Sequence, residues 1–304
     1  MARSNGAGDE GLVVRAVTSA PETAAAPRVS ILIRTKNEAR NLGATLDRVF
    51  SQSVPPFEVF VIDSGSRDRT LEVAARYPVC ILEIDPRRWS YSRALNLGAR
   101  AASCEFLVCL SAHCPPVTHD WLATLLRHFD DPLVAAAWGP SIGREPLAAE
   151  PPTVQAPGSY NLENRKWGLE NSNSILRRSL WLEFPFDESL PATEDKAWAR
   201  EAMTRGFSLV YDPAAAVWHK RHPVANSFRR NRAVLAGFEG MFPELRGSSP
   251  VGARAVSLSI WRKLLWHAAH RDVRRLLWDL RKAPSVLAGI AGKMVPRRPG
   301  GGPS

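Results

Sequence analysis

Residues 59–70 read Val-Phe-Val-Ile-Asp-Ser-Gly-Ser-Arg-Asp-Arg-Thr, an apolar run that ends in an acid and a turn of small polar residues. The run predicts a buried strand. Asp63 then lies at its carboxyl end, at the edge of an open α/β sheet where ligands bind. Gly65 permits a tight turn, and Ser66 or Asp68 can cap the helix that follows. The Asp63 carboxylate is therefore either an acceptor for a nucleotide base or ribose, or part of an ordinary strand–turn–helix junction.

A similar strand–turn–helix unit precedes this stretch. The strand is expected at Val29–Ile33, and a polar turn at residues 34–38 follows it. Helical spacing then recurs among the apolar residues Leu42, Leu46, Val49 and Phe50. Two such units in succession describe a nucleotide-binding βαβ arrangement, so the sequence predicts an α/β fold.

The two turns resemble those of the family 2 glycosyltransferases, which carry a Thr-x-Asn-Glu turn and a later Val-Ile-Asp-x-Gly-Ser-x-Asp-x-Thr segment. The matching positions are Thr35, Asn37, Glu38, Asp63, Ser66, Asp68 and Thr70. The resemblance covers residues 28–222 and implies the GT-A fold, a Rossmann-like nucleotide-binding sheet with helices on both faces. It also implies transfer of a sugar from a nucleotide diphosphate donor. The residues implied to bind this donor include Thr35, Asn37, Glu38, Asp63 and Ser66.

The resemblance also implies a division of the chain. A nucleotide-sugar half is expected at residues 28–138 and an acceptor half at 139–222. Residues 1–27 are rich in small and polar residues and predict a flexible tail. Residues 223–304 predict a basic, helical C-terminal region.

A further donor contact is expected on the helix predicted at residues 91–102. A similar helix borders the nucleotide-sugar pocket in the family, which implies that Arg93 faces the pyrophosphate. A guanidinium can bind such a group through two parallel hydrogen bonds. Arg87, Arg88 and Arg100 are alternative candidates, and close packing alone also explains a helix of small residues.

The largest departure from the family pattern follows the predicted strand Phe106–Leu110. Ser111 and His113 stand where most members carry an Asp-x-Asp pair that holds a divalent metal. Carboxylates suit hard cations such as Mg²⁺, whereas imidazole suits softer transition metals. Three alternatives follow: His113 helps to bind a divalent metal such as Mn²⁺ or Mg²⁺, it contacts the diphosphate directly, or the protein is catalytically impaired. His219 ends a segment that resembles the family's closing strand, and it is the second candidate ligand.

The acceptor half begins with a predicted loop. Residues 140–160 contain five prolines, and loops of such length are usually functional or disordered. Residues 170–178 resemble the family strand that lies under the acceptor. The resemblance implies acceptor contacts for Asn171 and Asn173, and for Trp198 in the next helix.

Glu194 and Asp195 begin that predicted helix, at the family's catalytic position. Acids are also favoured in the first turn of any helix by its dipole, which is the ordinary explanation. The resemblance implies that Asp195 is the general base of an inverting reaction. Glu194 then supports it, because neighbouring residues on a helix point about 100° apart.

The chain has 304 residues without a run of eighteen apolar ones, so no transmembrane helix is expected. Its cysteines are Cys80, Cys104, Cys109 and Cys114. Their spacing fits no common zinc pattern, so we expect reduced thiols in or near the core. Such thiols suit the cytoplasm.

The net charge of +10 is unevenly placed. Residues 220–304 hold 17 of the 40 Lys and Arg residues but 4 of the 30 Asp and Glu residues. Within them, 257–282 combine apolar residues at helical spacing, many basic residues and three tryptophans. Such a helix either anchors the protein on an anionic membrane surface or packs on the catalytic domain with its basic face in water. The first alternative predicts a peripheral protein on the inner face of the membrane.

Two other classes of protein are less consistent with the sequence. A nucleotidyltransferase would carry a glycine- and lysine-rich phosphate loop near its N-terminus, which this sequence lacks. The second class is a basic adaptor that binds nucleic acid, lipid or another polyanion. No segment resembles a base-reading motif, and the basic residues lie outside the predicted nucleotide domain. We therefore expect no nucleic-acid partner. The Ser-Ala-His variant resembles rhamnosyltransferase-like members, and the expected acceptor is a glycan, a lipid-linked sugar or a small molecule.

Overall fold

The structure is a computed structural model of the 304-residue chain. It describes residues 12–15, 29–143, 150–159, 168–219, 233–234, 236–237 and 240–241. The membrane helix predicted at residues 257–282 lies outside the described residues.

The chain divides into two compact units. Residues 1–189 and 194–220 form one unit, and residues 190–193 and 221–304 form the other. Residues 190–193 belong to the second unit, and the domain boundary expected at residue 222 stays a prediction. All elements below are in the first unit.

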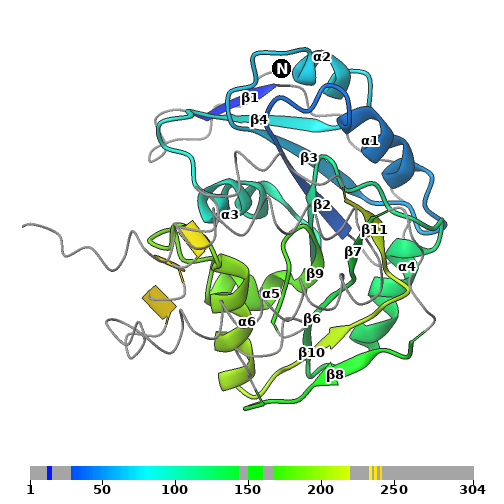
Figure 1. The fold of residues 1–304 in the computed structure, drawn as a ribbon, viewed down its shortest axis with the longest axis vertical. Helices are drawn as coiled ribbons and strands as arrows, with labels where there is room; N and C mark the ends of the chain where they lie inside the picture. Colours follow the sequence, from blue (N-terminus) through cyan, green and yellow to red (C-terminus); the bar gives the residue numbers. More distant parts are fainter. Residues whose placement is uncertain are drawn as a thin grey trace, which may run out of the picture. The chain divides into compact units, whose positions relative to one another are not determined.

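The described residues of this unit form a nine-stranded mixed sheet (Figure 1). Its order is β1 (Leu12–Arg15), β4 (Cys80–Ile84), β3 (Glu58–Asp63), β2 (Val29–Thr35), β5 (Phe106–Ser111), β9 (Asn173–Arg177), β6 (Val134–Trp138), β10 (Ser208–Tyr211) and β8 (Thr153–Gln155). Strands β2, β3, β4 and β5 run parallel, whereas β9 is antiparallel to both of its neighbours. A separate two-stranded ribbon pairs β7 (Ser141–Ile142) with β11 (Val217–Trp218).

Helices cover both faces of this sheet, as predicted. One face is covered by α1 (Leu42–Phe50), α2 (Thr70–Ala74) and α4 (Trp121–Leu126), and the other by α3 (Tyr91–Ala101), α5 (Arg178–Glu183) and α6 (Glu194–Thr204). Successive residues of a strand point to opposite faces, so Ile31 and Ile33 pack with the first set and Leu32 with the second. A parallel sheet buried in this way needs continuously apolar strands.

Three short strands lie where the sequence predicted none. The prediction of a flexible tail is wrong for β1, an apolar Leu-Val-Val-Arg run that pairs antiparallel with the open edge of β4. The predicted loop at residues 140–160 contains β7 and β8, and β8 pairs with β10 at the other edge. Such edge strands carry little local signal, because their pairing partner is distant in the sequence.

Gly139 marks a close approach between two segments. A Cβ built at this position would lie 1.8 Å from the carbonyl oxygen of Ala215, whereas a Cβ at Gly143 meets nothing within 4 Å. Gly139→Ala is therefore expected to lower the free energy of unfolding by about 1–3 kcal/mol through overpacking. Urea denaturation measures the change, with Gly143→Ala as the matched control. Equal stability of the two variants would contradict the packing described here.

None of the helices in the described part of the chain has the length and apolarity that a bilayer crossing requires. The four cysteines are free thiols, and three of them are buried.

Candidate active site

The sheet register brings the sequence motifs to one edge. Thr35 lies opposite Asp63 in the β2–β3 ladder, and Arg34 lies opposite Ser111 in the β2–β5 ladder. The turns that follow these three strands therefore leave the sheet side by side. This is the carboxyl edge, where open α/β sheets bind ligands.

Hydrogen bonds cross-link the first two turns. The backbone N–H of Asn37 donates to Ser66 Oγ (2.8 Å), and the Asn37 side chain accepts from the Arg67 N–H (2.8 Å). The N–H of Glu38 donates to Thr70 Oγ1 (2.8 Å). Asn37 has a φ of 55°, a left-handed conformation that asparagine tolerates better than most residues. Asn37 and Ser66 thus build the wall of the site, and their predicted contact with the nucleotide stays a prediction.

Asp63 shapes its own turn. Its buried carboxylate accepts hydrogen bonds from the N–H groups of Gly65 (2.9 Å) and Ser66 (2.8 Å) and from the Ser66 hydroxyl. Gly65 has a φ of 84°, which explains the glycine there. Asp68 accepts from the Thr70 N–H (3.0 Å) just before α2, whose N-cap position is Arg69. Asp63 therefore forms its turn, which is one of the two roles that the sequence allowed. Its contact with the nucleotide stays a prediction.

Thr35 has a buried hydroxyl group with which a ligand could form a hydrogen bond. Its side chain is buried, and its hydroxyl has no hydrogen-bond partner among the described residues. A buried hydroxyl without a partner costs about 1–3 kcal/mol. A bound nucleotide at this edge of the sheet would remove that cost.

A histidine cluster lies beyond β5. His113 Nδ1 is 2.9 Å from Glu38 Oε1, and Glu38 Oε2 accepts from the Asn41 side chain (2.6 Å). The rings of His113 and His219 stand nearly perpendicular, with centroids 5.0 Å apart. One ligand atom each from His113, Cys114 and His219 lie within 4.8 Å of one another. Burial raises the pKa of Cys114 to about 12, so its sulfur is a thiol here.

The acidic pair at the start of α6 is fixed from two sides. Glu194 Oε1 lies 3.5 Å from Arg34 Nη1 and accepts from Asn171 Nδ2 (3.3 Å). Asp195 Oδ2 accepts from the Asn171 N–H (3.2 Å), and its Oδ1 accepts from the Lys196 N–H (2.8 Å). Burial, and then the neighbouring Asp195 carboxylate, raise the pKa of Glu194 to about 7. Glu194 is therefore about half protonated near neutral pH, and a buried carboxyl group with a raised pKa is typical of acid–base sites.

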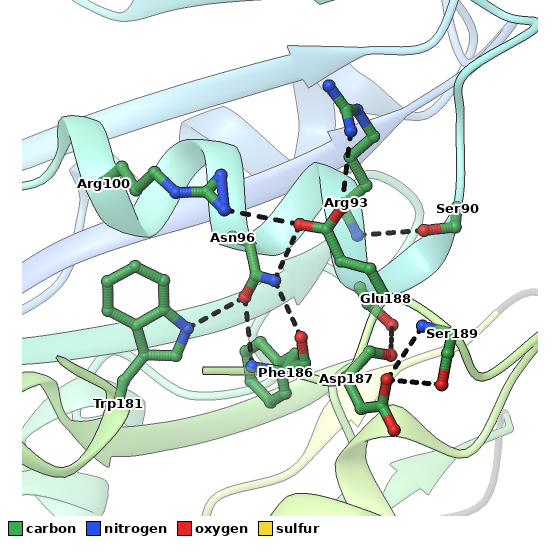
Figure 2. Close-up of polar contacts among 10 residues, drawn as sticks. Ser90, Arg93, Asn96, Arg100, Trp181, Phe186, Asp187, Glu188 and Ser189 are labelled. Atoms are coloured by element: carbon green, nitrogen blue, oxygen red, sulfur yellow. Dashed lines mark hydrogen bonds and ion pairs between the residues drawn. The ribbon is translucent and has the colours of Figure 1, made fainter. Parts of the chain in front are cut away.

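Arg93 is engaged in an ion pair. Figure 2 shows the Glu188 carboxylate between Arg93 and Arg100 of α3, with N–O distances of 3.4 Å to each. The buried Asn96 amide also donates to Glu188 Oε1 (3.0 Å) and holds the Phe186 backbone through two hydrogen bonds. Ser90 caps α3, since its hydroxyl accepts from the Arg93 N–H. Arg93 thus helps to anchor residues 186–188 on α3, and its contact with the pyrophosphate stays a prediction.

Two of the residues expected to contact the acceptor lie in the core, and their acceptor contacts stay predictions. Asn173 is fully buried, accepts from Trp121 Nε1 (2.9 Å) and donates to the Ala215 carbonyl (2.7 Å). Trp198 is 2% exposed and packs against Phe184 in the core. Asn171 is also buried and holds the acidic pair. The polar run that ends at Ser174 resembles a surface segment, but distant partners satisfy it inside the protein.

Arg34 is a site residue that the sequence motifs did not indicate. The signal was present, because an arginine in an otherwise apolar strand must find partners when it is buried. Cys114, likewise, was expected only as a core thiol.

Comparison with known proteins supports the predicted family and fold. Residues 30–184 match the family model "Glycosyl transferase family 2". The chain is 26% identical over 210 residues to the O-antigen chain rhamnosyltransferase RfbN of Salmonella typhimurium, covering 64% of this chain and 67% of that one. It is 36% identical over 229 residues to the glycosyltransferase AglE of Haloferax volcanii, covering 71% and 74%.

Solved structures share the fold. The mannosyltransferase PcManGT of Pyrobaculum calidifontis, in complex with GDP-Man and Mn²⁺, matches with a TM-score of 0.62 and 21% identity, covering 92% of this chain and 89% of that one. TarS 1–349 of S. aureus in complex with UDP matches with a TM-score of 0.53 and 18% identity, covering 70% and 65%. The family model and the relatives together show that this chain belongs to glycosyl transferase family 2 and is a sugar-transferring enzyme of the GT-A fold.

Proposed function

We propose that this glycosyltransferase moves the sugar of a nucleoside diphosphate donor to a hydroxyl acceptor with inversion, and that Asp195 is the general base. The observation that carries the proposal is the Glu194–Asp195 pair, held by Arg34 and Asn171 at the start of α6. A hydroxyl is a weak nucleophile and needs its proton removed as the new bond forms. Retention through a covalent intermediate would need a second carboxylate as nucleophile, and Glu194 is instead committed to Arg34 and Asn171.

The donor site is proposed at the carboxyl edge of β2, β3 and β5. The buried, unpartnered Thr35 hydroxyl supports a ligand there, and the cross-linked turns after β2 and β3 form a rigid wall. Solved structures that share the fold bind GDP-Man, UDP or UDP-GlcNAc. These complexes support a nucleoside diphosphate sugar as the donor class.

The rhamnosyltransferase RfbN, which builds an O-antigen chain, supports a deoxyhexose donor and a glycan or lipid-linked acceptor. A donor and an acceptor of these kinds support a role for the enzyme in polysaccharide biosynthesis. We propose that it acts in the cytoplasm, on the inner face of a membrane. Residues 257–282 would hold it there, and their tryptophans and basic residues support contact with anionic lipid.

A divalent metal fits the cluster of His113, Cys114 and His219. Their ligand atoms are close enough to share one ion. Imidazole and thiolate suit transition metals better than Mg²⁺, and a bound cation would remove the proton of the Cys114 thiol. Glu38 would orient the His113 ring through its hydrogen bond to Nδ1, without binding the ion itself. A bound cation would neutralise charge on the departing diphosphate. Direct contact between His113 and the diphosphate is the alternative.

Thermal shift with a panel of nucleotide sugars, each with and without Mn²⁺, tests the proposed donor class. A ligand at a hundred times its dissociation constant stabilises the folded protein by about 2.7 kcal/mol. We expect at least one nucleoside diphosphate sugar to raise Tm by several degrees, and the matching nucleoside alone to raise it less. A panel in which no nucleotide sugar shifts Tm more than its nucleoside would overturn the proposal.

A further inference from the structure

Arg34 is a partly buried cation at the carboxyl end of β2. Its side chain is 14% exposed. Nη1 lies 3.5 Å from Glu194 Oε1, and Nη2 donates to the Asn171 carbonyl (3.0 Å). Its guanidinium carbon is 5.2 Å from the centre of the Tyr91 ring, so the group also rests on an aromatic face. The Arg34 guanidinium thus contacts three separate segments of the chain, which contain Tyr91, Asn171 and Glu194.

Asn171 connects this guanidinium to the second acid. Its carbonyl accepts from Arg34, while its own N–H donates to Asp195 Oδ2 and its side-chain amide donates to Glu194 Oε1. The Ser174 hydroxyl donates to the side-chain oxygen of Asn171, Oδ1 (3.4 Å). Arg34 therefore contacts Glu194 directly and Asp195 through a single residue.

We infer that Arg34 is a positioning residue for base catalysis, which orients the Glu194–Asp195 pair and balances its charge. Because this role presupposes that Asp195 is the base, it rests on the proposed function. A base displaced by 1 Å can lose on the order of a hundredfold in rate. Asn171 transmits the position of Arg34 to Asp195.

The electrostatics of the pair agree with this role. Burial and Asp195 raise the pKa of Glu194, and the Arg34 charge acts in the opposite direction. The Cys109 thiol of β5 interacts electrostatically with both acids, and burial raises its pKa to about 12, which leaves it neutral. Loss of the positive charge at residue 34 would therefore raise the pKa at which the acidic pair loses its last proton.

The pH dependence of turnover in Arg34→Gln tests this role. We expect kcat at pH 7 to fall by roughly ten- to a hundredfold, with the donor KM within about twofold of wild type. The acid limb of the kcat profile should move up by about one pH unit, so that part of the activity returns at higher pH. Arg48→Gln, which changes an exposed arginine on α1, is the matched control and should match wild type.

Arg34→Lys keeps the charge and provides a second variant if Arg34→Gln fails to fold. Its acid limb should stay at the wild-type position, while kcat falls severalfold because an ammonium cannot replace the two-armed contact. An unshifted acid limb in folded Arg34→Gln, a shifted one in Arg34→Lys, or a defect confined to donor KM would each overturn the role. The Asp195→Asn variant distinguishes failure of the Arg34 role from failure of the proposed function. Normal turnover in Asp195→Asn would reject Asp195 as the base and, with it, the proposed function.

Discussion

Asp195→Asn is expected to lose at least about a hundredfold in turnover while it still binds the donor nucleotide. A positioned base contributes roughly a hundred- to ten-thousandfold in rate. The substitution removes the base but keeps the shape of the side chain. The amide oxygen can still accept from the Asn171 N–H, as Oδ2 does now. Steady-state kinetics measure the loss, and calorimetry with the nucleoside diphosphate measures the retained affinity.

The matched control for this variant lies on the same helix. Glu201 is an exposed residue of α6 that pairs with Arg205 (2.7 Å). Glu201→Gln removes a charge of the same sign from α6 without touching Arg34 or Asn171, so turnover should stay within about twofold of wild type. Near-normal turnover in Asp195→Asn would contradict the assignment of the base.

Removal of metal is expected to cause the second large loss. Excess chelator should lower turnover at least about tenfold, and Mn²⁺ or a similar transition ion should restore it better than Ca²⁺. Glu38→Gln should weaken metal affinity by roughly 10- to 100-fold, because the outer-shell partner of a ligating histidine sets its orientation. Metal analysis of the purified protein and calorimetric titration measure binding independently of turnover.

A histidine outside the cluster provides the control. His119 is exposed, and its backbone carbonyl accepts from the Ser53 N–H, so His119→Ala should leave metal binding unchanged. Full activity in excess chelator would reject the metal and favour direct contact of His113 with the diphosphate. Loss of metal binding in His119→Ala would place the ion elsewhere.

Much of the fold was predictable because its signals are local. The apolar strands β2, β3 and β5 each end in a polar turn, and parallel strands place such turns at one edge. The same local pattern located Glu194 and Asp195 at a helix start. These features depend on neighbouring residues, which the sequence displays directly.

The contacts that were missed depend on distant residues. Asn173 is polar but buried, and Trp121 and Ala215, both distant in the sequence, satisfy its amide. Arg34 meets Glu194, a residue 160 positions away in the sequence. Local sequence shows neither partner, so a buried polar group and a surface one look alike at that level.

The configuration of the product at its anomeric carbon tests the central claim most directly. Proton NMR early in the reaction reports the anomer formed when the enzyme transfers the donor sugar to an acceptor, or to water. A single in-line displacement assisted by Asp195 predicts a product whose configuration is inverted relative to the donor. A product that retains the donor's configuration would contradict the account.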